Sequence, residues 1–147
     1  MESEPSNLLP SGFRYEVHKT VTATDIHLWA GLTGKRPRTQ GASAFAQRKA
    51  VAHQVAPDAY LAGLAVDTAS RLAARLPPPG AVLAGLTMSF TASLLVGTTL
   101  CLAVTVTAWD AAADLYWLDV CATRADGTPV MTGKAALRPH RTLLAAA

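Results

Sequence analysis

A run of three prolines and a glycine at residues 77–80 divides the chain into two parts whose side chains repeat with different periods. Before the run, apolar or small residues recur three and four positions apart, as on one face of an α-helix. The members of this stripe are Leu61, Leu64, Ala65, Thr68 and Leu72. Pro57 suits a first helical position and the proline run cannot continue a helix, so the sequence predicts one long helix over residues 57–75.

After the proline run the period changes to two, which is the alternation of β-strands. Asp126-Gly127 adds a turn signal before the last of these segments. The predicted strands cover residues 13–22, 82–90, 100–108, 116–122 and about 128–137. We expect the four later strands to form an antiparallel meander. This order of elements predicts an α+β fold in which a curved antiparallel sheet wraps around one long central helix.

The side chains along the predicted helix are unusually small, with alanines and Gly63 between the larger apolar residues. Small side chains let a sheet approach a helix closely. We therefore expect Gly63 to lie where the sheet encloses the helix.

The composition narrows the class of protein. A length of 147 residues suits one domain, and with half of them hydrophobic the chain has enough apolar material for a core. The net charge of +3 comes without a basic stripe that carries interleaved aromatic residues, so no nucleic-acid partner is expected. No secretory signal is visible, and no apolar run reaches the roughly 18 residues of a membrane span, so we expect a cytoplasmic protein with no membrane segment.

The ends of the chain differ in composition from its middle. Residues 1–12 contain two prolines and a glycine and are expected to form a flexible N-terminal arm. Residues 13–139 are expected to form the domain, and residues 140–147 are expected to form a flexible C-terminal tail.

A short helix is expected just before the longer one. Thr24 or Asp25 provides its N-terminal cap, and Gly31 and Gly34 end it. A basic loop then follows, and residues 42–50 suggest a second short helical piece that forms a lid or wall.

Cys101 and Cys121 fall in predicted strands, with no further cysteine or histidine at metal-ligand spacing beside either one. We interpret them as buried free thiols and expect neither a metal nor another cofactor.

Four segments resemble, in order and in approximate spacing, the MaoC-like hydratases and dehydratases of the hot-dog superfamily. They are residues 24–34, 55–64, 90–100 and 127–135, and they resemble the family patterns T-x-x-D-I-x-x-F-A-x-L-T-G, V-A-H-G-x-x-x-x-G-L, F-x-x-P-V-x-x-G-D-T-L and G-x-x-V-x-x-G-x-A. The resemblance covers residues 20–137 and implies a hot-dog fold, an acyl thioester of coenzyme A or a carrier protein as ligand, and a homodimer or a heterodimer with another hot-dog subunit.

The sequence departs from the family pattern at the positions of the catalytic residues. In the family an Asp and a His perform acid/base catalysis in a G-D-x-N-P-x-H loop. Here Lys35 stands in place of the Asp, Thr39 in place of the His, and the loop is one residue shorter. Pro57 also replaces a histidine beside the central helix. The resemblance therefore implies the fold and the ligand class but not the reaction.

The remaining candidates for catalysis are His53, Asp58 and Tyr60, which flank the start of the long helix. His53 and Asp58 form either a displaced catalytic dyad or, alternatively, a surface histidine and an aspartate that interacts with the helix dipole. Tyr60 either lines an acyl tunnel or packs in the core. The amide groups of Asp58, Ala59 and Tyr60 are expected to be free to polarise a thioester carbonyl.

The expected substrate-binding residues are Lys35, Arg36, Arg38, Ala59 and Phe90. The first three form a basic group suited to coenzyme A phosphates or to an acidic carrier protein, with a solvated basic face as the alternative.

Three functions follow from this pattern. The first is a protein that either binds an acyl or polyketide thioester or both binds and processes it, by dehydration, isomerisation or cyclisation without the usual dyad. The second is a non-catalytic partner subunit of a heteromeric hot-dog dehydratase. The third is a thioesterase that uses Asp58.

Overall fold

The computed structural model describes residues 9–34, 55–76 and 80–140. Within these ranges the chain forms two helices and five strands. In chain order they are β1 (Arg14–Thr20), α1 (Ala23–Thr33), α3 (Asp58–Ala73), β2 (Ala81–Phe90), β3 (Thr99–Asp110), β4 (Leu115–Arg124) and β5 (Pro129–Pro139). Each predicted strand and the long helix is present, with bounds that differ by a few residues. The predicted helical piece at 42–50 lies outside the described residues.

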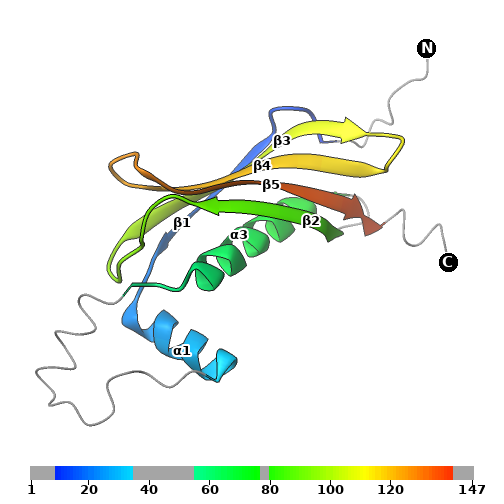
Figure 1. Ribbon diagram of the computed structural model, residues 1–147. Helices are drawn as coiled ribbons and strands as arrows, with labels where there is room; N and C mark the ends of the chain where they lie inside the picture. The colour runs from blue at the N-terminus through cyan, green and yellow to red at the C-terminus, as the bar shows by residue number, and fades with distance from the viewer. Residues whose placement is uncertain (1–8, 35–54, 77–79, 141–147) are drawn as a thin grey trace, which may run out of the picture.

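The strands form one antiparallel sheet in the order β1-β3-β4-β5-β2, and this sheet curves over α3 (Figure 1). α1 lies below the sheet, near the start of α3. The arrangement confirms the predicted α+β fold, with a curved sheet around a central helix.

The predicted four-stranded meander is wrong in one connection. β3, β4 and β5 are consecutive neighbours, but β2 pairs with β5 at the far edge of the sheet instead of with β3. The segment between β2 and β3 runs past the start of α3, where the Ala56 amide donates to the Leu94 carbonyl at 2.7 Å and Val55 forms a β-bridge with Leu95. Alternation along a strand gives its faces but not its neighbours, so the sequence pattern did not reveal this crossover.

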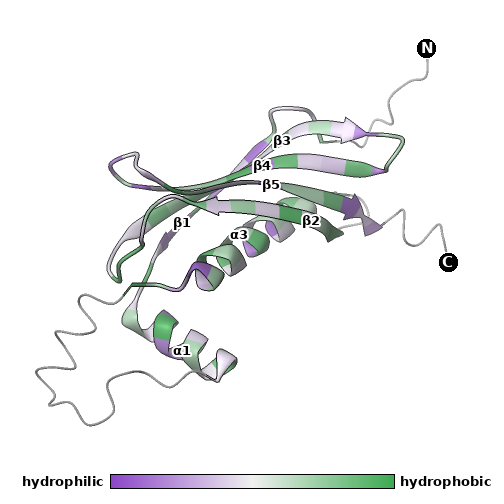
Figure 2. Ribbon diagram, in the orientation of Figure 1, coloured by the Kyte–Doolittle hydropathy of each residue, from purple (hydrophilic) through white to green (hydrophobic). Residues whose placement is uncertain are grey.

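The core lies between α3 and the concave face of the sheet. The helix buries Leu61, Ala65, Thr68 and Leu72, as its sequence stripe predicted, whereas Leu64 is only partly buried. The Asp67–Arg71 ion pair at 3.0 Å lies on the exposed side of the helix. Figure 2 shows green, apolar stretches on both α3 and β2.

Gly63 does not face the sheet, which corrects the expectation from the small side chains. It is exposed, and a Cβ atom built on it would meet only the Trp29 ring of α1, at 3.8 Å. The helical phase places Leu61, Ala65 and Leu72 toward the sheet and turns Gly63 toward α1.

The two cysteines are free, but they are half-exposed and not buried as predicted. β3 turns Leu100, Leu102 and Val104 toward α3, so Cys101 between them points to the opposite, outer face of the sheet. Cys121 occupies the same face on β4, opposite Ala103.

Residues 9–12, part of the predicted arm, contact the sheet. The Leu9 amide donates to the Tyr116 hydroxyl at 3.2 Å, and the Gly12 amide donates to the Val106 carbonyl at 2.7 Å.

Candidate functional site

The start of α3 leaves backbone amide groups unpaired. Pro57 occupies the N-cap position and has no side chain that accepts a hydrogen bond. The amides of Tyr60 and Leu61 both donate to the Pro57 carbonyl, at 3.0 and 3.3 Å, so the expected free amide of Tyr60 is in fact satisfied. The amides of Asp58 and Ala59 have no acceptor among the described residues.

The Tyr60 side chain is the most unusual polar group of this helix start. The residue is only 8% exposed, and among the buried side chains of the described ranges its hydroxyl alone has no hydrogen-bond partner. Its ring packs edge-on against the Trp29 ring of α1, with the ring centroids 6.0 Å apart and the planes at 79°. Buried hydroxyl groups are normally paired, so an unpaired one suggests a polar group of a ligand.

The surroundings of Tyr60 keep its hydroxyl protonated. Burial is the main cause, and the nearby Asp25 carboxylate adds to it through its negative charge and through a weak polar interaction with the hydroxyl that does not have the geometry of a hydrogen bond. Together they raise the pKa of Tyr60 to about 12. A phenol with this pKa remains neutral at physiological pH and is available as a hydrogen-bond donor.

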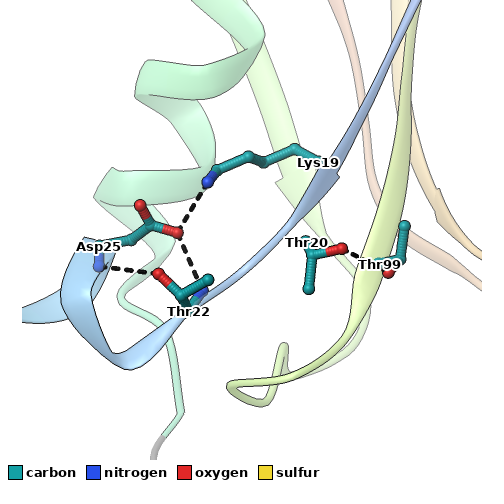
Figure 3. Close-up of polar contacts among 5 residues, drawn as sticks. All are labelled: Lys19, Thr20, Thr22, Asp25 and Thr99. Atoms are coloured by element: carbon teal, nitrogen blue, oxygen red, sulfur yellow. Dashed lines mark hydrogen bonds and ion pairs between the residues drawn. The ribbon is translucent and has the colours of Figure 1, made fainter.

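Asp25 belongs to a polar cluster at the junction of β1 and α1. The Thr22 hydroxyl accepts from the Asp25 amide at 3.1 Å, while the Asp25 carboxylate accepts from the Thr22 amide at 2.9 Å. This reciprocal capping box makes Thr22 the N-cap, so the predicted cap at Thr24 or Asp25 is wrong. Lys19 reaches from β1 to the same carboxylate at 2.9 Å (Figure 3).

Asp25→Asn is expected to lower stability at neutral pH by about 1 kcal/mol, because the charge on an N-terminal capping residue and its ion pair are both lost. The hydrogen bond from Lys19 is the main cause that lowers the pKa of Asp25 from 3.8 to about 2. A lowered folded-state pKa contributes stability that is complete above about pH 4 and is lost as the pH falls toward 2. Denaturant unfolding between pH 2 and 7 should therefore show a shallower acid limb in the variant.

Asp119→Asn is the matched control. The ion pair between Asp119 and Lys134, at 3.1 Å, is largely exposed and should contribute little to stability at any pH. An acid limb unchanged by Asp25→Asn would contradict the expected role of the carboxylate.

The structure places the sequence-predicted site residues unevenly. Asp58 and Ala59 are exposed in the first turn of α3, whereas Tyr60 points inward, since residues two apart on a helix face different sides. Phe90 lies at the end of β2, 39% exposed and opposite Met131 of β5. Lys35, Arg36, Arg38 and His53 lie outside the described residues. Trp29 and Asp25 lie beside Tyr60 but were not predicted as site residues. Both belong to the family-like segment 24–34, which is the sequence signal that could have identified them.

A hollow of about 1100 Å³ lies on the outer face of the sheet. Trp117, Cys121 and Ala136 line it together with the charged residues Arg14, Asp119, Lys134 and Arg138. These side chains point away from α3, so the hollow and the start of α3 are on opposite sides of the sheet. The hollow is therefore separate from the tyrosine site.

Comparison with known proteins finds similarity in structure only. No protein-family model matches the chain, and no curated protein matches it significantly in sequence. The R-hydratase PhaJ1 from Pseudomonas aeruginosa is similar with a TM-score of 0.72, at 22% identity over 89% of this chain and 83% of that one. A variant of the fluoroacetyl-CoA-specific thioesterase FlK has a TM-score of 0.65, at 14% identity over 90% and 89% of the two chains.

A hot-dog-like protein from Thermanaerovibrio acidaminovorans has a TM-score of 0.61, at 18% identity over 88% of this chain and 82% of that one. In the described ranges no helix is both long enough and apolar enough to cross a bilayer. At these identities the likeness concerns the fold alone, and together with the curved sheet around α3 it confirms that the chain has the hot-dog fold.

Proposed function

We propose that this protein binds an acyl thioester, carried by coenzyme A or by a carrier protein, with the thioester at the start of α3. The observation that carries the proposal is the buried Tyr60 hydroxyl, which has no partner among the described residues and is held protonated by its surroundings. A thioester carbonyl is a hydrogen-bond acceptor of the kind that this donor lacks.

The backbone at the start of α3 supports the same ligand. The unpaired amides of Asp58 and Ala59 lie at the positive end of the helix dipole, which favours a carbonyl oxygen carrying partial negative charge. Hot-dog proteins of similar structure include a hydratase and a thioesterase specific for fluoroacetyl-CoA. In this proposal Ala59 and Phe90 contact the acyl chain, and Lys35, Arg36 and Arg38 bind the phosphates of the carrier.

Tyr60→Phe is expected to weaken binding of an acyl-CoA such as crotonyl-CoA by about tenfold, the value of one hydrogen bond near 1.4 kcal/mol. The variant should leave the binding of free coenzyme A unchanged, because free coenzyme A has no thioester carbonyl. Its melting temperature should be equal or higher, since an unpaired buried hydroxyl has been removed. Titration calorimetry and thermal unfolding measure the two effects.

Tyr15→Phe provides the matched control, because Tyr15 is a partly buried tyrosine on β1 that is not part of the helix start. If Tyr60→Phe lowers the melting temperature and leaves acyl-CoA binding unchanged, the Tyr60 hydroxyl has a structural partner within the protein. This result would overturn the proposal.

The exposed edge strand favours a second candidate, a partner subunit of a larger hot-dog assembly. Within the part of the chain that the structure describes, β2 pairs only with β5, and its Val82, Leu86 and Phe90 are 43%, 37% and 39% exposed. A long edge strand with exposed apolar residues is suited to pairing with another chain. We infer that the protein assembles through this edge, as a homodimer or with a related hot-dog subunit.

Asp58 is the carboxylate on which any catalysis by this chain would depend. It is exposed in the first turn of α3, and it makes no hydrogen bond or ion pair to another described residue. Dehydration, isomerisation or cyclisation would need a proton-transferring partner, for which His53 is the candidate. Hydrolysis would instead need Asp58 to activate water.

A further inference from the structure

A histidine, a cysteine and a carboxylate meet on the outer face of the sheet, although nothing in their spacing along the chain connects them. The register of β1 and β3 pairs His18 directly with Cys101. Glu16 lies two residues before His18 and therefore points to the same face. One ligand atom from each of the three lies within 4.8 Å of the others.

The chemistry of these three side chains matches a borderline transition-metal ion. Zn²⁺ takes thiolate, imidazole and carboxylate ligands together, whereas Mg²⁺ and Ca²⁺ prefer oxygen ligands alone. Bonds of about 2.0 to 2.3 Å place the ligand atoms of a tetrahedral site about 3.3 to 3.8 Å apart. The side chains of Glu16 and His18 are exposed, so rotations about their side-chain bonds can close the remaining distance.

One positive charge competes with a metal at this place. The Arg14 Nε atom lies 2.7 Å from Glu16 Oε1, and the two side chains are 49% and 42% exposed. Exposed ion pairs contribute little to stability, so a divalent ion with three ligands can displace the arginine.

We propose that Glu16, His18 and Cys101 bind Zn²⁺, with water completing the coordination. The ion would link the edge strand β1 to β3, on the side of the sheet opposite α3. The site is thus independent of the tyrosine at the start of α3, and neither proposal needs the other.

Co²⁺ titration of the full chain, carrying no affinity tag, tests the site because Co²⁺ replaces Zn²⁺ and reports its ligands. We expect one ion per chain, with the visible bands of a tetrahedral ion and a near-ultraviolet charge-transfer band from a thiolate, all removed by added Zn²⁺. His18→Ala and Cys101→Ser should each weaken binding by at least about tenfold, since even changes outside the ligand shell cost that much. Zn²⁺ should raise the melting temperature of the unsubstituted chain.

The chain provides matched controls for both ligands. Cys121→Ser changes the other free cysteine on the same face, and His27→Ala changes an exposed histidine on α1; neither should alter the spectrum. Arg14→Gln should tighten binding, because it releases Glu16 and removes a positive charge. The absence of a thiolate band in the unsubstituted chain, or a band that survives Cys101→Ser, would overturn the proposal.

Discussion

Replacing Gly133 with alanine is expected to destabilise the protein by about 3 kcal/mol, the upper part of the range for overpacking, because the new methyl group has no space. A Cβ atom at this position would overlap the Thr87 carbonyl oxygen and lie 3.1 Å from the Met88 Cα atom. Both are backbone atoms of β2, which pairs with β5 at this place, so the strands would have to separate. Denaturant unfolding should show the loss.

Gly31→Ala is the matched control and is expected to change stability in the opposite direction. Gly31 lies inside α1, and a Cβ atom there would meet nothing within 4 Å. Alanine in a helix interior is favoured over glycine by about 0.5 to 1 kcal/mol. Equal stabilities for the Gly133→Ala variant and the unsubstituted protein would show that β2 does not lie against β5 as described.

The purified chain alone is expected to hydrate crotonyl-CoA far more slowly than about 1 per second, a rate at the lower end for ordinary enzymes. Residues 35–40 contain no histidine and no carboxylate, and general acid–base catalysis by such groups contributes about 10² to 10⁴ in rate. Asp58, the carboxylate at the start of α3, has no hydrogen-bond partner among the described residues to orient it. Spectrophotometric hydration and release of free thiol should be measured together, so that hydrolysis is not missed. Turnover typical of an efficient hydratase would contradict this expectation.

Asp58→Asn separates the functions that remain, because the amide is nearly the same shape as the acid but transfers no proton. If Asp58→Asn folds normally but no longer turns over the true substrate, Asp58 is a catalytic residue. A lower turnover rate in His53→Ala would then support a dyad of the two residues. Unchanged turnover by an assembly with a second hot-dog subunit would favour the partner role. Asp67→Asn, an exposed aspartate further along α3 that pairs with Arg71, is the matched control.

The local sequence determined the elements of this fold. The helical stripe, the proline run and the alternating segments predicted α3 and the five strands, because these periods follow from the geometry of the backbone itself. The stripe also identified the buried side of α3, from Leu61 to Leu72. The four family-like segments predicted the hot-dog fold that the structure has.

The tertiary structure decided which elements and side chains meet. The crossover of β2 to the far edge, the outward direction of Cys101 and the contact of Tyr60 with Trp29 depend on strand order and helix packing, which short-range patterns do not encode. His18 and Cys101 are 83 residues apart in the chain and become neighbours only through the β1–β3 register. For this reason ligand spacing in the sequence predicted no metal, while the folded sheet brings three ligand atoms within 4.8 Å.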